Sequence, residues 1–214
     1  MKPTADRVVL RALPKEDIAD MLGSLWLPQS VADTQRYMIG EVAFVGSGCE
    51  LIPGLRVVHR QFHYVELPDD LRMFWEYDIL AVLKKGTDGM YTVVPLRNCL
   101  VVEELPPDAY EGKIILIEEQ ERSLRGTVLA VGPGLLADED GKRWPMDVAE
   151  GDTIAFAKFA GTKLAIDGSE VLILDEDKVL AKLVDDGTEE RPGRTRRSLP
   201  SGYSGATPSR LTVK

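Results

Sequence analysis

An internal repeat restricts the fold of this chain more than any other feature of its sequence. Three pairs of windows resemble each other, at offsets of 86, 92 and 99 residues: 40–48 with 126–134, 2–10 with 94–102, and 78–83 with 177–182. The order of the windows is kept while their spacing drifts, which is the pattern left by duplication followed by changes in loop length. We therefore expect two related domains, over residues 1–85 and 91–186.

Each half consists of short apolar runs separated by turn residues, which is typical of a small all-β domain. Leu164–Ile166 and Glu170–Leu174 flank Asp167-Gly168, a dipeptide that readily takes the positive φ angles of a tight hairpin turn. Asp140-Gly141 predicts another hairpin between Leu135 and Pro145. We expect two tandem small β-barrels, because closing a sheet into a barrel removes its exposed edges.

Residues 187–214 differ in composition from the rest of the chain. They are rich in Gly, Pro, Ser, Thr and Arg, and six basic residues stand against Glu189 and Glu190. Such a segment buries too little apolar surface to offset its ordering entropy, so we expect a disordered, basic tail. A tail that contacts a polyanion or a protein partner is the alternative.

Charge and motif content exclude several classes of function. The net charge of −9 argues against nucleic acid as a partner, because binding phosphates needs clustered Lys and Arg. The longest apolar runs, such as Ile114–Ile117, are far shorter than the roughly 20 residues of a membrane span. The sequence has no G-x-S-x-G elbow, no Walker loop and no nucleophile paired with a base. We expect neither an enzyme nor a cofactor.

Cysteine and histidine content predicts no metal site and a reducing compartment. Cys49 and Cys99 are too few for a disulfide framework, and residues 1–9 do not resemble a secretory signal, so we expect a cytoplasmic protein. His59 and His63 lie four apart in a strand-like stretch, where roughly 13 Å would separate their Cα atoms. We therefore expect a buried or edge histidine at these positions and no metal ligand.

Ordered blocks of the second half resemble the GroES co-chaperonin (chaperonin-10) family. They are residues 126–134, 141–142, 145–148, 151–153, 158–162, 167–170 and 177–181. The first half resembles the same family more loosely, through residues 2–3, 6–8, 40–48 and 78–83. The whole chain resembles a tandem, two-domain co-chaperonin, a form also known from plastids. The resemblance and the start of the chain together suggest a bacterial or virus-encoded protein, or a mature plastid form.

The resemblance implies that the chain caps a GroEL-type chaperonin ring. Members of the family bind the ring through a mobile loop with an apolar tripeptide, assist ATP-dependent folding and modulate the chaperonin's ATPase. The second domain has such a loop at 106–125, and the first domain at about 14–39. The tripeptides are Ile114, Ile115 and Leu116, and Leu25, Trp26 and Leu27. Trp26 departs from the family's small aliphatic centre, so its site either contacts the chaperonin or serves packing or another partner.

The resemblance also bears on assembly and on the partner. The first domain is about 13 residues shorter after Gly48, where residues 135–148 of the second domain match the hairpin that builds the roof of the family's dome. The family self-associates into a ring with seven equivalent contacts, whereas this chain offers domains in twos. Either three or four chains share a ring, or seven chains each use one domain. The alternative function is a duplicated binding module that serves another assembly, such as a viral one, without chaperonin activity.

Overall fold

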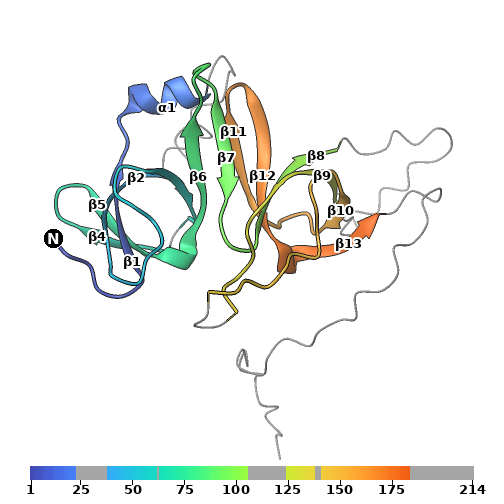
Figure 1. Ribbon diagram of the computed structural model, residues 1–214. Coiled ribbons are helices and arrows are strands. Elements are labelled where there is room, and N and C mark those ends of the chain that lie inside the picture. Colours follow the sequence, from blue (N-terminus) through green and yellow to red (C-terminus); the bar gives the residue numbers. More distant parts are fainter. Residues whose placement is uncertain (23–37, 62, 106–123, 138–140, 184–214) are drawn as a thin grey trace, which may run out of the picture. The chain divides into compact units, whose positions relative to one another are not determined.

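A seven-stranded antiparallel sheet forms the first half of the protein. The computed structural model describes residues 1–22, 38–61, 63–105, 124–137 and 141–183 (Figure 1). The strands of this half follow the order β4-β5-β1-β2-β3-β6-β7 in the sheet. Its elements are β1 (Arg7–Ala12), α1 (Lys15–Leu22), β2 (Ile39–Val45), β3 (Arg56–His59), β4 (Val65–Leu67), β5 (Leu71–Trp75), the 3₁₀ turn η1 (Glu76–Asp78), β6 (Ile79–Lys85) and β7 (Tyr91–Pro95).

The second half is a six-stranded antiparallel sheet that repeats the order of the first. Its order is β11-β12-β8-β9-β10-β13, so each strand occupies the position of one of the first six strands in the other sheet. Its elements are β8 (Cys99–Glu104), β9 (Leu124–Val131), β10 (Thr153–Phe156), β11 (Thr162–Ile166), β12 (Ser169–Asp175), the 3₁₀ turn η2 (Glu176–Lys178) and β13 (Val179–Leu183). The expectation of an all-β protein with two tandem domains of one fold is confirmed.

The irregularities of the two sheets repeat as well. The β1–β2 ladder shifts register between Val9 and Leu10, and the β8–β9 ladder shifts between Val101 and Val102, 92 residues later. Pairing places β6 and β13 at an offset of 100, because Ala81 opposes Val58 where Ala181 opposes Ala155. The offset of 99 predicted for residues 78–83 is therefore wrong by one residue. It matched Asp78 to Asp177, whereas an offset of 100 matches Leu80, Ala81 and Leu83 to identical residues.

Each sheet encloses an apolar core of its own. In the first, the fully buried Val8, Leu10, Phe74 and Ile79 pack with neighbours from β2, β3 and β6. In the second, the residues of the core are Leu100, Val102, Val128, Val148, Ile154, Phe156, Leu172 and Leu174. Side chains alternate between the two faces of a strand. The strands therefore also carry apolar residues on the face that points away from these two cores.

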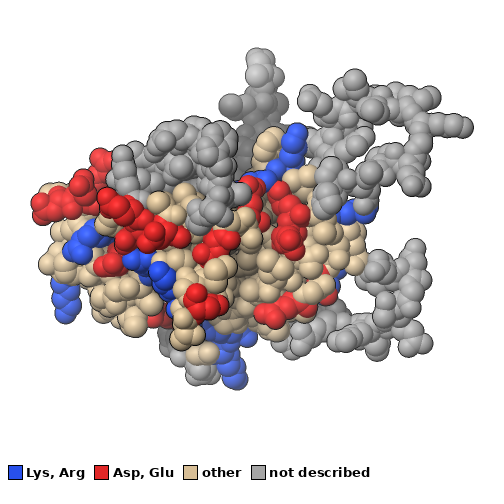
Figure 2. All heavy atoms as spheres, turned by 90° about the horizontal axis from the view of Figure 1, so that it is seen from above, with Lys and Arg blue, Asp and Glu red and all other residues tan. Residues whose placement is uncertain are grey.

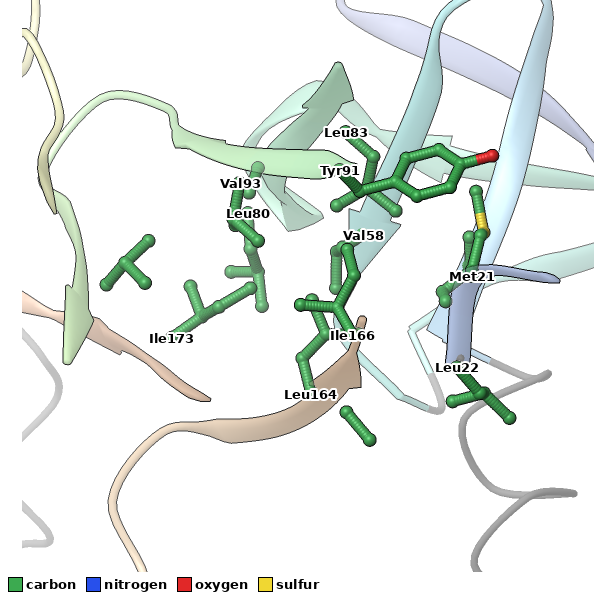
Figure 3. Packing of buried hydrophobic residues seen from close by; sticks show 14 of the residues in the cluster. Met21, Leu22, Val58, Leu80, Leu83, Tyr91, Val93, Leu164, Ile166 and Ile173 are labelled. Carbon is green, nitrogen blue, oxygen red and sulfur yellow. The ribbon is translucent and has the colours of Figure 1, made fainter. Parts of the chain in front are cut away.

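A third core joins the two halves (Figure 3). It combines Leu80 and Leu83 of β6 and Val93 of β7 with Leu164 and Ile173 of the second sheet. β7 follows the first domain in the chain but pairs with β6, so it extends the first sheet at this joint. We call this contact between the halves the interdomain joint.

Helix α1 is a feature that the sequence analysis did not predict. It lies inside the segment 14–39, which was expected to be a loop throughout. Ile18, Met21 and Leu22 bury one side of the helix in the third core. The helix forms because these apolar residues are spaced three and four apart and because acidic residues occupy its first turn.

Candidate functional site

The residues predicted to bind a chaperonin lie outside the described part of the chain. Leu25, Trp26 and Leu27 fall in 23–37, and Ile114, Ile115 and Leu116 fall in 106–123. Their assignment as binding residues stays a prediction, as does the disorder of the basic tail. The structure describes the strands from which both segments leave the barrels.

Both predicted loops interrupt the same hairpin of the fold. β1 and β2 pair as far as Ala12 opposite Gly40, and β8 and β9 pair as far as Glu104 opposite Gly126. These are equivalent positions of the two sheets, and the second hairpin continues with a hydrogen bond of 2.9 Å from the amide of Leu105 to the carbonyl of Arg125. The two apolar triplets therefore belong to equivalent segments of the two domains.

The base of the first loop is tied to the second domain. The amides of Asp167 and Gly168, in the β11–β12 turn, donate to the carbonyls of Met21 and Leu22 at 2.8 and 3.1 Å. These carbonyls end helix α1 and have no partner within the helix itself. Near the start of α1, Asp17 accepts a hydrogen bond of 2.7 Å from Arg56 of β3. The first loop thus begins at a helix that is held from both domains.

A glutamate in each 3₁₀ turn holds the loop that follows β2 or β9. A side-chain oxygen of Glu76 accepts from the amides of Glu50 and Leu51, and one of Glu176 accepts from those of Asp147 and Val148. Leu51 is therefore the counterpart of Val148. The segment missing from the first domain ends before Asp147, and not at Val148 as the sequence comparison suggested.

The extra segment of the second domain contains a short hairpin that contacts the first domain. Leu136 and Arg143 form its bridge, and residues 138–140 lie outside the described part of the chain. A guanidinium nitrogen of Arg143 donates to both carboxylate oxygens of Glu50 at 2.7 Å. Glu50 stands where the first domain omits this hairpin, so the hairpin of one domain is held by the shortened loop of the other.

Polar contacts complete the interdomain joint. Arg60 donates to both oxygens of Asp175 at 2.8 and 2.6 Å, and the thiol of Cys99 lies 3.6 Å from the same carboxylate. Arg97 donates to the backbone carbonyls of Tyr77 and Ile79. The joint is thus held by charge-assisted hydrogen bonds as well as by its apolar core.

His59 and Cys99 have packing roles in the structure, whereas His63 is exposed and lies 3.2 Å from Asp78. His59 is buried against Phe74, with ring centroids 4.1 Å apart, and burial lowers its pKa to about 4. This confirms the expected buried histidine. Burial, reinforced by the nearby carboxylate of Asp175, raises the pKa of Cys99 to about 12, which leaves the thiol protonated and unreactive. No group of three metal-ligating side chains occurs among the described residues.

The surface around α1 is acidic. Figure 2 looks down on this side of the molecule and shows acidic side chains in a band with isolated basic ones between them. Glu16, Asp17 and Asp20 of α1 contribute to this charge. A polyanion would be repelled from this face. No helix in the described ranges has the length and apolar content needed to cross a membrane.

Sequence reasoning missed the residues of the interdomain joint. The spacing of Ile18, Met21 and Leu22 after Pro14 is a helix signal that could have been read. Arg60 and Asp175 are 115 residues apart. A single sequence carries no signal for this pair.

Comparisons with known proteins agree with this architecture. The family described as Chaperonin 10 Kd subunit matches residues 92–183. The 20 kDa chloroplastic chaperonin of Spinacia oleracea is 30% identical over an alignment of 198 residues, and the match covers 86% of this chain and 75% of the relative.

Single-domain relatives match about half of the chain. The co-chaperonin GroES of Corynebacterium kroppenstedtii is 44% identical over 91 residues, which are 42% of this chain and 91% of the relative. The co-chaperonin GroES of Mycolicibacterium smegmatis is 44% identical over 92 residues, and the match covers 42% of this chain and 91% of the relative. The relative from Spinacia oleracea, at 30% identity, spans both halves of the chain, and a family match covers nearly all of the second half. The chain therefore belongs to the chaperonin 10 family.

Proposed function

We propose that this protein is a co-chaperonin that caps a GroEL-type chaperonin ring and assists ATP-dependent folding while slowing the ring's ATPase. The observation that supports this most directly is the repeated hairpin. Both domains leave the β1–β2 or β8–β9 hairpin at equivalent positions, and both departing segments carry an apolar triplet. In this proposal the chaperonin binds the ATP, and the chain itself needs no cofactor and catalyses no reaction.

Weak individual contacts suit a cap that must leave in each ATP cycle. Burying an Ile or Leu side chain stabilises a complex by roughly 1.5–3 kcal/mol, from which the cost of ordering the loop is subtracted. One triplet alone would therefore bind weakly. Several triplets linked through one assembly bind tightly because each added contact is intramolecular.

The proposal includes self-association into a ring-like oligomer in the cytoplasm of its cell. In sheet order, β13 stands at the position of β6, but no described strand pairs with its outer edge, whereas β6 pairs with β7. Exposed strand edges favour pairing with another chain. A head-to-tail assembly of copies would cover this edge and bring several loops to one side of a ring.

A charge in the second triplet tests the proposal. We expect Ile115→Asp to abolish both inhibition of chaperonin ATPase and refolding of a stringent substrate, because an unpaired carboxylate in an apolar groove costs several kcal/mol per site. Ile52→Asp changes a side chain that is 61% exposed and lies outside both loops, and it should behave as the parent protein does.

The two loops should contribute unequally. Trp26 requires a larger pocket than Ile115, so we expect Trp26→Asp to reduce refolding less than Ile115→Asp does. If Ile115→Asp inhibits ATPase like the parent, the loop assignment is wrong, and a duplicated binding module without chaperonin activity becomes the better description. An equal or larger loss with Trp26→Asp contradicts the asymmetry alone.

A further inference from the structure

The two equivalent strands β6 and β13 differ sharply in burial. Leu80 of β6 is 3% exposed and Leu83 is 5% exposed, because both lie in the core of the interdomain joint. Their counterparts in β13, Leu180 and Leu183, are 64% and 37% exposed. The same surface of the fold is thus covered in the first domain and uncovered in the second.

The surface that covers β6 also has an uncovered counterpart. In the joint, Asp175 at the end of β12 meets Arg60, which directly follows β3. The residue equivalent to Asp175 in the first domain is Trp75, at the end of β5. Trp75 is 39% exposed, and the guanidinium of Arg7 lies 3.7 Å from the centre of its ring. The first domain therefore presents an indole where the second presents a carboxylate.

We propose that Trp75 is a principal contact between copies of this chain, and that it packs against Ala157 and the exposed face of β13 in a second copy. Ala157 follows β10 at the position that Arg60 has after β3. The interdomain joint, repeated between chains, therefore brings Trp75 to Ala157 where it brings Asp175 to Arg60 within a chain. This inference rests on the self-association in the proposed function and names the residues that would mediate it.

The exchange of residues gives the two joints different chemistry. Within a chain, the contact is an ion pair with nitrogen–oxygen distances of 2.6 and 2.8 Å. Between copies, an indole and a methyl group would meet beside Leu180, so the contact would be apolar. Partly exposed tryptophans are typical anchors of protein interfaces. Such a contact responds weakly to salt, whereas an exposed ion pair is screened.

A charge exchange tests this inference. Trp75→Asp and Leu180→Asp change the two opposing surfaces, and Trp75→Asp combined with Ala157→Arg would recreate between copies the ion pair of the interdomain joint. Ile52→Asp is the matched control on a different exposed loop. Self-association of each purified full-length protein is measured by sedimentation over a range of concentrations. Each series is run in low salt and in about 0.5 M salt, which screens exposed ion pairs.

We expect Trp75→Asp and Leu180→Asp each to raise the dissociation constant by at least about tenfold, which is the effect of losing an interface anchor. The double variant should associate more tightly than Trp75→Asp alone and should lose that gain in high salt. Leu180 is mostly exposed, so its variant keeps the test valid if Trp75→Asp does not fold.

Two results overturn the inference, and they differ from a failure of the proposed function. If the parent protein associates and both single variants associate equally well, Trp75 is not a contact. If the double variant shows neither recovery nor salt dependence, Ala157 does not face position 75. If the parent remains a single chain at every concentration, the proposed ring fails first and this contact fails with it.

Discussion

Removing Arg60 should lower the free energy of unfolding more than removing Asp175, although both substitutions break the same ion pair. The side chain of Arg60 is 36% exposed, whereas that of Asp175 is 14% exposed. After Asp175→Ala, the guanidinium can recover much of its hydration. After Arg60→Ala, a largely buried carboxylate keeps only the weak thiol donor of Cys99 among the hydrogen bonds described above.

These exposures set the expected magnitudes. Breaking a fully buried pair costs about 3–5 kcal/mol and an exposed pair is worth about 0–1 kcal/mol. We therefore expect Arg60→Ala to lower the free energy of unfolding by about 2–4 kcal/mol and Asp175→Ala by about 1–2 kcal/mol. The double variant should cost about 1 kcal/mol less than the sum of the single ones, because the second substitution no longer leaves a charge unpaired.

Urea unfolding of the parent and the three variants measures these differences. All four proteins are compared at one concentration and one salt, since self-association stabilises the folded state by mass action. Equal losses, or a larger loss with Asp175→Ala, would refute the assignment of the carboxylate as the buried partner. Strict additivity would show that the two side chains do not interact in solution.

Two further predictions concern residues within the barrels. Burial lowers the pKa of His59 to about 4, below its unfolded value of about 6.5, so its contribution to stability is complete above pH 6.5 and is lost as the pH falls toward 4. We expect about 2 kcal/mol of this contribution to be lost between pH 7.5 and pH 5. His59→Phe, which introduces the residue found at the equivalent Phe156, should remove this loss in urea titrations at the two pH values. Unchanged pH dependence would contradict this. Gly46→Ala and Gly132→Ala should each cost at least about 1–3 kcal/mol in thermal unfolding, because a Cβ at either glycine would overlap a backbone carbonyl, of Ala5 or of Arg97; a neutral effect at both would show that these strands separate easily.

The duplication was readable from the sequence because turn glycines and apolar runs are local signals. A Cβ at Gly46 or Gly132 would overlap the carbonyl oxygen of Ala5 or Arg97, so both domains need a glycine at this position. The register of β6 and β13 was readable as well: at an offset of 100, Leu80, Ala81 and Leu83 each match an identical residue, whereas at 99 no residue of Ile79–Leu83 does.

The interdomain joint, in contrast, could not be predicted from the sequence. Its contacts join residues far apart in the chain, such as Arg60 with Asp175, and no local pattern pairs them. Helix α1 is intermediate: its apolar spacing is present in the sequence, but the resemblance to the chaperonin 10 family implies a loop over the same residues. Of the candidate site, the sequence predicted the apolar triplets, and the structure describes only the strands that flank them.

The position of β7 affects how the protein is made. Residues 1–85 leave the ribosome before Tyr91–Pro95, so β6 has an open edge until the beginning of the second domain has been synthesised. The carbonyls at the end of α1 gain their hydrogen-bond donors later still, when Asp167 and Gly168 have been synthesised. Leu80 and Leu83 stay exposed during this interval, and an exposed apolar strand edge favours aggregation. The first domain of this chaperonin 10 protein is therefore itself vulnerable during translation, and a gene fragment that stops at residue 85 would encode a poorly soluble product.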